Sequence, residues 1–194
     1  MFFVRLRELL LVLSNDETAK STKSMQNTRP IKVHHCFATV ASDYTKRPHV
    51  FKIILADRSQ FLFQSSDSRE MHSWIDILNW NSAKFSAPAL EPPCSSSRRF
   101  ERPLLPTSIT RLNSKDQLTS LQTTLHRFEE DFNELNQLIN NSSKSHLSHH
   151  KKEIKERLAF YQFEIRRLVS FFVLLLNFIE IATNVGVMLQ FILI

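Results

Sequence analysis

The first 64 residues alternate between short apolar runs and polar segments, a pattern typical of a small antiparallel sheet. The predicted strands lie at 2–6, 9–13, 31–41, 50–56 and 60–64. Asp57, Arg58 and Ser59 separate the last two runs and predict a hairpin, although the glycine that usually marks such a turn is missing. The polar stretch at 15–30 is a predicted loop. His34 and His35, as neighbours on a strand, are expected to point to opposite faces of the sheet.

A helix is predicted over 67–82, directly after the last strand. Asp67 and Glu70 have the spacing of a capping box at its start. One face of this helix is apolar, and it carries Met71, Trp74, Ile75 and Leu78. We expect Met71, Trp74 and Leu78 to form structural core against the sheet. Strands followed by one closing helix predict a β-rich domain at 1–85.

The segment at 86–112 contains five of the seven prolines, which predicts an extended, basic Pro/Ser-rich linker. Beyond the linker, apolar residues recur at alternating steps of three and four, the spacing of paired helices. The first series is Leu118, Leu121, Leu125, Phe128, Phe132, Leu135 and Ile139. The second series is Ile154, Leu158, Tyr161, Ile165, Leu168, Phe172 and Leu175. Ser114 and Gln117 have capping-box spacing at the start of the first helix.

Charge favours pairing of these two helices with each other. Residues 113–143 carry two basic and five acidic side chains (net −3), and residues 144–194 carry seven and four (net +3). Opposite charges on neighbouring helices suit an antiparallel hairpin or coiled coil, predicted at 113–167 with a polar break at 140–150. The alternative is that each helix pairs with another chain.

The C-terminal segment at 168–194 is strongly apolar. Leu, Ile, Val and Phe make up 18 of its 27 residues, and Glu180 is its one charged residue. This length and composition predict a transmembrane helix, with the preceding lysines and arginines on the cytosolic side, so that the chain would be tail-anchored. The alternatives are a buried core helix and an aberrant C-terminus.

Composition excludes several classes of enzyme. Gly186 is the single glycine, so no phosphate-cradling glycine-rich loop can be formed. Cys36 and Cys94 give neither zinc spacing nor a disulfide framework. The loop that contains His146, His149 and His150 has no cysteine, so we expect no metal site there. No spacing places a nucleophile beside its base; we therefore predict no catalytic residue, no cofactor and no enzymatic activity.

Several motifs resemble one known family. Residues 31–52 read IKVHHCFATVASDYTKRPHVFK, and shorter matches lie at 61–64, 70–75, 85–88, 102–106 and 116–118. These stretches resemble the pleckstrin-homology (PH) domain and following region of the PSD family, the pleckstrin-and-Sec7 exchange factors for Arf GTPases. The resemblance covers roughly residues 1–167.

The resemblance implies an α+β fold: an incomplete PH-like antiparallel β-sandwich with a closing C-terminal helix, then an antiparallel helical hairpin and an apolar helical tail. It also implies phosphoinositide binding. In the family, the basic loop that binds most of the headgroup precedes the position that matches Phe2, so the PH domain is expected to be truncated. Nothing matches the Sec7 domain, so exchange activity is not carried over to this chain.

Two groups of basic residues are candidate lipid contacts. Lys46 and Arg47 match the family's Lys-Arg-Pro, and Lys32 lies on a neighbouring predicted strand; these three are the predicted headgroup-binding residues. The alternative is a solvated turn. In the linker, the predicted membrane-surface residues are Arg98, Arg99 and Arg102.

We therefore predict a non-enzymatic module that binds anionic lipid, a phosphoinositide, at the cytoplasmic face of a membrane. By resemblance this is the plasma membrane, and Arf-pathway proteins are further expected partners. The net charge of +6 is spread mildly along the chain, which does not predict nucleic-acid binding. The alternatives are a coiled-coil scaffold that pairs with a protein partner, and a fragment without independent lipid binding.

Overall fold

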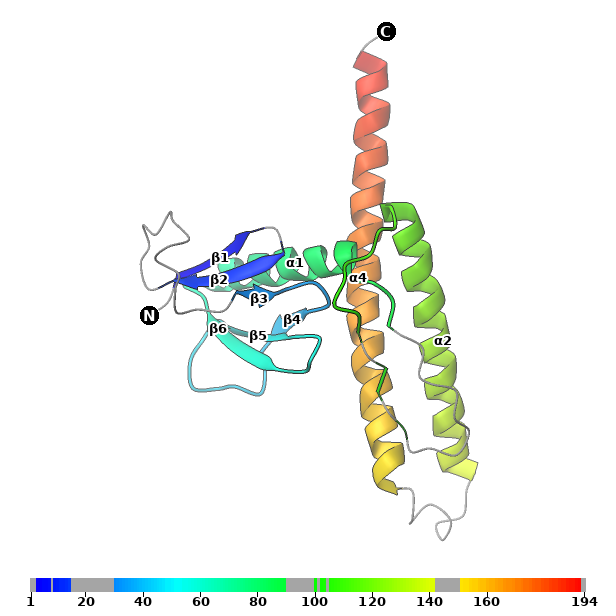
Figure 1. Cartoon of the computed structure of the whole chain (residues 1–194). Coiled ribbons are helices and arrows are strands. Elements are labelled where there is room, and N and C mark those ends of the chain that lie inside the picture. Colours follow the sequence, from blue (N-terminus) through cyan, green and yellow to red (C-terminus); the bar gives the residue numbers. More distant parts are fainter. Residues whose placement is uncertain are drawn as a thin grey trace. The chain divides into compact units, whose positions relative to one another are not determined.

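The computed structural model describes residues 3–7, 9–14, 30–89, 100, 102–103, 105–141 and 151–192, with side chains up to Ile181 (Figure 1). The predicted loop at 15–30 thus lies outside the described residues except for Pro30, and so does most of the break at 140–150. The chain divides into two compact units, Met1–Phe85 and Ser86–Ile194.

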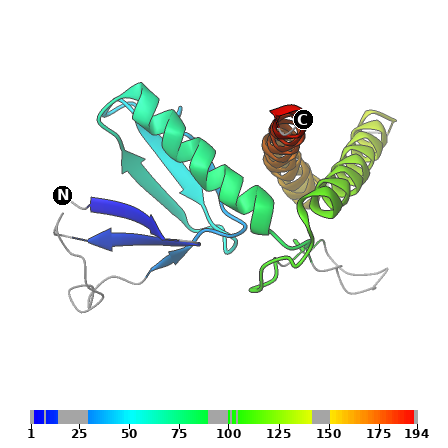
Figure 2. The same cartoon turned by 90° about the horizontal axis from the view of Figure 1, so that it is seen from above.

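The first unit contains two three-stranded antiparallel sheets and a closing helix. The first sheet consists of β1 (Phe3–Arg7), β2 (Leu10–Ser14) and β3 (Ile31–Lys32), in that order. The second consists of β4 (Phe37–Val40), β5 (Val50–Ile54) and β6 (Gln60–Gln64), also in chain order. Helix α1 (Ser68–Phe85) follows, and Figure 2 shows it beside the two sheets. The described strands form no closed barrel, so the predicted incomplete sandwich with a closing helix is confirmed.

The predicted strand at 31–41 is divided between the two sheets. A turn at residues 33–36 separates β3 from β4, closed by the Cys36 N–H, which donates to the Val33 carbonyl at 3.0 Å. His35 adopts a left-handed conformation there, with φ of 67°. His34 and His35 are both buried, with ring centroids 4.9 Å apart, so the prediction that they alternate across a strand is wrong. The reason is that the chain must turn here to pass from one sheet to the other.

The predicted hairpin at 57–59 is formed without glycine. Arg58 takes the left-handed position, with φ of 69°. Asp57 supports the turn, because its Oδ1 accepts hydrogen bonds from both the N–H (2.9 Å) and the hydroxyl (2.6 Å) of Ser59. These bonds hold the pKa of the Asp57 carboxyl below its usual value. A short acidic side chain therefore stabilises a turn that glycine usually occupies.

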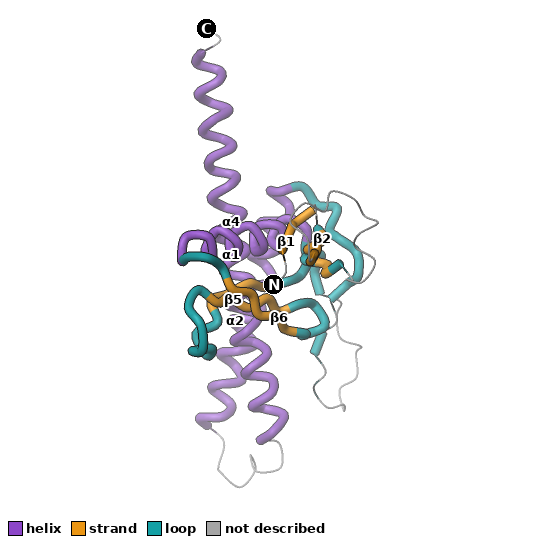
Figure 3. Tube along the Cα trace, turned by 90° about the vertical axis from the view of Figure 1, so that its left-hand side faces the viewer, coloured by secondary structure: helices purple, strands orange, loops and turns teal. Residues whose placement is uncertain are grey.

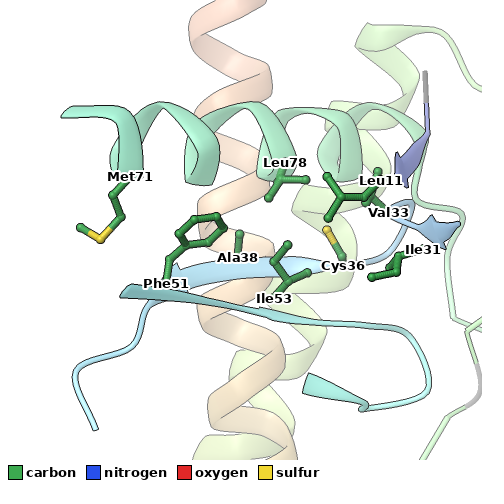
Figure 4. Packing of buried hydrophobic residues seen from close by; sticks show 9 residues of the cluster. All are labelled: Leu11, Ile31, Val33, Cys36, Ala38, Phe51, Ile53, Met71 and Leu78. Carbon is green, nitrogen blue, oxygen red and sulfur yellow. The ribbon is translucent and has the colours of Figure 1, made fainter. Parts of the chain in front are cut away.

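The core of the first unit lies between the sheets and α1 (Figure 4). Its buried members come from four strands, the β3–β4 turn and the helix. They are Leu11, Ile31, Val33, Cys36, Ala38, Phe51, Ile53, Met71 and Leu78. Phe63 stacks on Phe51 with a centroid distance of 5.5 Å and adds the side of β6 to this core.

The start of α1 is capped, though not by a reciprocal box. Asp67 Oδ1 accepts the Glu70 N–H at 2.8 Å, as the spacing predicted. The Glu70 carboxylate, however, accepts from the N–H and the hydroxyl of Ser66, one residue earlier than a capping box requires. These two bonds lower the pKa of Glu70. The Glu70 carboxylate pairs with Ser66 and not with the Asp67 N–H, because Ser66 offers it two donors, an N–H and a hydroxyl.

The second unit is built on two long helices, α2 (Ser114–Asn141) and α4 (Lys151–Ile192). They run antiparallel, and the C-terminal part of α4 extends beyond the N-terminal end of α2 (Figures 1 and 3). Phe128 of α2 makes edge-to-face contacts with Phe160 and Tyr161 of α4, both at 5.8 Å between centroids. The Tyr161 hydroxyl donates to Asp131 Oδ2 at 3.2 Å, and burial raises the pKa of Tyr161. The predicted antiparallel hairpin is confirmed.

The packing residues of α4 differ from the predicted series after Leu168. Phe171 is completely buried, whereas Phe172, which the heptad pattern selected, is only partly buried. The buried face of α4 also includes a charged pair, Glu164 and Arg167, whose carboxylate and guanidinium meet at 2.6 and 3.0 Å. Apolar residues that alternate strictly at steps of three and four suit the underwound helix of a coiled coil. The observed spacing 164–167–171–175 is closer to the 3.6 residues per turn of an ordinary α-helix.

The predicted transmembrane helix at 168–194 is not supported. In the part of the chain that the structure describes, no helix is both long enough and apolar enough to cross a membrane. The physical reason is visible at the start of the apolar segment, where Leu168, Phe171 and Leu175 are buried by the fold. These three apolar side chains pack within the protein, whereas Val169, Val173, Phe178 and Ile181 of the same segment are exposed.

Helix α2 is capped one residue earlier than predicted. Asn113 Oδ1 accepts from the N–H groups of Lys115 and Asp116, both at 3.0 Å, and its Nδ2 donates to Asp116 Oδ2 at 2.6 Å. The predicted box between Ser114 and Gln117 is wrong, because Gln117 is buried and its Nε2 instead donates to the Ser86 carbonyl at 2.7 Å.

This cap can be tested by alanine substitution. Asn113→Ala should lower the free energy of unfolding of the second unit by about 1 kcal/mol, since two helix-terminal N–H groups lose their acceptor. Ser114→Ala, the matched control, should have a much smaller effect. Thermal unfolding followed by helical circular dichroism compares the two; a larger loss from Ser114→Ala would contradict the assignment.

Candidate headgroup-binding surface

A basic loop joins β4 to β5 at residues 41–49. Its start is closed by the Tyr44 N–H, which donates to the Ala41 carbonyl, and Ala41 in turn donates to the Val50 carbonyl, both at 3.0 Å. Near its end, His49 adopts a left-handed conformation with φ of 54°, and its carbonyl accepts the Ser65 N–H at 3.0 Å. These bonds attach the loop to the sheet at both of its ends.

Lys46 and Arg47 lie at the exposed tip of this loop. Arg47 Nη1 donates to Gln64 Oε1 at 3.3 Å, which orients the guanidinium toward the end of β6. Arginine offers several donors in a planar fork, so one hydrogen bond to Gln64 leaves donors for a phosphate oxygen. Two neighbouring cations on an exposed loop can bind an anionic group, and solvent weakens such an interaction.

Lys52, on β5 beside the loop, is paired. Its ammonium group lies 2.8 Å from Asp43 Oδ1, and this hydrogen bond lowers the pKa of Asp43 below its usual value. Lys52 therefore already has an acidic partner, and the exposed positive charge of the loop comes from Lys46 and Arg47.

The other predicted contact residues do not lie in this loop. Lys32 is exposed on β3, a strand of the other sheet. Arg98 and Arg99 lie outside the described residues, and Arg102 is exposed in the second unit. The structure thus brings Lys46 and Arg47 together but adds none of the other predicted residues to them.

The predicted core residues of α1 lie on its inner side. Met71 and Leu78 are buried, and Trp74 is partly buried against the same cluster. The helix also buries polar residues that the apolar pattern did not select. Asn79 Oδ1 accepts the Ala38 N–H at 2.8 Å, and its Nδ2 donates to the Ala38 carbonyl at 2.9 Å. Ala38 lies on β4, the outer strand of its sheet, so one side chain satisfies both main-chain groups of an edge residue.

Ser82 makes a similar contact one turn further along α1. Its hydroxyl donates to the Val33 carbonyl at 2.7 Å and lies 3.2 Å from the Cys36 sulfur. Asn79 and Ser82 together attach α1 to β4 and to the turn before it, and β4 leads directly into the basic loop. In the sequence, Asn79 and Ser82 could have been recognised as two polar residues close to Leu78 on the face of the helix that is expected to be buried.

Among the described residues, no cluster of three or more His, Cys, Asp or Glu side chains has the proximity required to hold a metal ion. His146, His149 and His150 lie outside these residues.

Comparison with known proteins agrees with the fold. Residues 1–83 match the family described as the pleckstrin homology domain. Over 175 residues, 88% of its length, the chain is 31% identical to a Caenorhabditis elegans protein named "Exchange factor for Arf-6". The chain spans about a fifth of the length of that relative (20%). Residues 1–83 are thus similar to the pleckstrin homology domain, and most of the chain is similar to part of an exchange factor for Arf-6.

Proposed function

We propose that this chain binds the anionic surface of a membrane through Lys46 and Arg47, with a phosphoinositide headgroup as the ligand. The observation that carries the proposal is the pair of adjacent exposed cations on a loop whose two ends are hydrogen-bonded to the sheet. Arg47 is held by Gln64, which reduces the conformational freedom that it would lose on binding a phosphate.

The module acts by binding, not by catalysis, at the cytoplasmic face of the membrane. The relationship to an Arf exchange factor supports a role beside proteins of the Arf pathway. Within that role, the PH domain would concentrate its protein at a surface that carries the right lipid. Exposed Arg102 in the linker adds to the attraction toward the same surface.

Vesicle binding tests this function. The full chain is mixed with phosphatidylcholine vesicles that contain a phosphoinositide, and the bound fraction is measured by flotation. Lys46→Gln with Arg47→Gln should weaken binding about 30-fold, because each basic residue near an anionic surface contributes about 1 kcal/mol. The matched control is Lys152→Gln with Lys155→Gln, which removes the same charge from exposed positions on α4 and should change binding little.

Two further vesicle compositions separate the explanations. Pure phosphatidylcholine gives the binding that arises from apolar contact alone. Phosphatidylserine at the same total charge separates headgroup recognition from attraction to any negative surface. Equal binding to all vesicles, or an equal loss for the loop variant and the α4 variant, would overturn the proposal.

A further inference from the structure

The described part of the predicted linker contacts the helix pair instead of running free. Ser86 forms an isolated antiparallel bridge with Ile109, and its carbonyl accepts the side-chain N–H of Gln117 on α2. Between these two points, Phe100 lies against α4. Of the segment at 86–109, which we call the strap, the structure thus describes two ends that are held together and a residue between them, Phe100, that is attached to a helix.

Three interactions hold Phe100. Its ring packs edge-to-face on Phe160, with centroids 5.6 Å apart and an interplanar angle of 61°. The Arg157 guanidinium carbon lies 5.6 Å from the centroid of the same ring, within the range of a cation–π contact. The Phe100 main-chain N–H donates to Glu153 Oε1 at 3.1 Å. An aromatic ring and its own N–H group are thus recognised together.

The residues that receive Phe100 belong to the helix pair itself. Phe160 also packs edge-to-face with Tyr161 at 5.4 Å and with Phe128 at 5.8 Å, so three rings are already assembled by α2 and α4. Arg157 and Glu153 lie on the same helix as Phe160, one and two turns before it. The groups that receive Phe100 are therefore connected to one another by contacts within the helix pair.

The site also offers a donor that the strap does not use. The Nε–H of Arg157 is buried, and within the described residues it has no hydrogen-bond partner. A buried donor without an acceptor is unfavourable. A ligand with a carbonyl or carboxylate beside its aromatic ring would satisfy this group, which Phe100 does not.

We propose that this part of α4 is a docking site for an extended peptide that presents an aromatic side chain, and that Phe100 occupies it in cis. The ligand inserts its ring between Phe160 and the Arg157 guanidinium, donates its main-chain N–H to Glu153, and accepts from Arg157 Nε. The strap is then an autoinhibitory segment, because a partner binds only by displacing Phe100. A tethered occupant competes at an effective concentration in the millimolar range, so the unaltered chain resists weak ligands.

The experiment uses a peptide of residues 96–106 of this chain, which contains Phe100, with a fluorescent label. Its binding to the full chain and to the full chain with Phe100→Ala is measured by fluorescence anisotropy. We expect the Phe100→Ala chain to bind the peptide at least about tenfold more tightly, because its site is no longer occupied in cis. A Phe100→Tyr chain keeps an aromatic occupant and should behave like the unaltered chain.

Two controls make the result decisive. The same peptide with alanine in place of Phe100 keeps its arginines; equal binding by this peptide would show mere charge attraction and overturn the proposal. Circular dichroism verifies that the Phe100→Ala chain retains its helices. If this folded variant fails to bind the peptide, or binds it no better than the unaltered chain, the proposal is wrong.

Discussion

Leu78→Ala should lower the free energy of unfolding of the PH domain by about 2–5 kcal/mol. Leu78 is 0% exposed and lies at the centre of the cluster that joins α1 to the sheets (Figure 4). Alanine would remove its apolar contacts and leave a cavity that the strands around it cannot fill completely. This loss approaches the whole stability of a small domain.

The measurement can be confined to this domain. Trp74 and Trp80 are the two tryptophans of the chain, and both lie on α1. Urea unfolding followed by tryptophan fluorescence therefore reports on the first unit alone. Ile77→Ala is the matched control: Ile77 is the neighbouring residue, is 46% exposed, and should cost less than about 1 kcal/mol. Equal effects of the two substitutions would contradict the packing of α1.

Asn79→Ala should destabilise the same domain by at least about 2 kcal/mol, although it removes no large apolar group. The substitution leaves the N–H and the carbonyl of Ala38 without their partner, and each buried group left unsatisfied costs about 1–3 kcal/mol. The two costs fall on one edge residue of β4, so the variant should also expose that edge to pairing with other chains.

Asn81→Ala provides the comparison. Asn81 is half-buried, and its side chain donates to the Ile77 carbonyl within α1. Alanine favours helix more than asparagine does, so this control should be neutral or slightly stabilising. The same fluorescence-monitored unfolding measures both variants. A stable Asn79→Ala protein would show that water replaces the side chain, and the edge role of Asn79 would be rejected.

The strands and helices could be predicted because they follow from periodicity: short apolar runs, a capped helix and two series of apolar residues at helical spacing indicated the strands, α1, α2 and α4. The arrangement as an incomplete sandwich was implied by the resemblance to the PSD family, and opposite charges favoured the pairing of α2 with α4. The corner at His34 and His35 was missed because its cause is not local. The segment turns there since its two halves pair with different strands, β2 and β5.

Polar groups in the interior were harder to predict. Asn79 and Ser82 find their partners in main-chain groups 41 and 49 residues away, which no local pattern reveals. Gln117 was assigned to a helix cap by its spacing, but the Ser86 carbonyl, 31 residues away, is its partner. In the candidate site, Lys46 and Arg47 were selected by resemblance, whereas their fixation through Gln64 and His49 required the structure.

The contact between Asn79 and Ala38 has a consequence during synthesis. The outer strand β4 emerges from the ribosome before the helix that covers its edge, with 41 residues between the two partners. At ordinary elongation rates of about 5–20 residues per second, Asn79 is synthesised about 2–8 seconds after Ala38, and the edge of β4 is uncovered until then. During this interval the nascent sheet offers unpaired main-chain groups to any neighbouring strand. The risk that the newly made domain pairs with another chain therefore depends on how soon α1 is synthesised after β4.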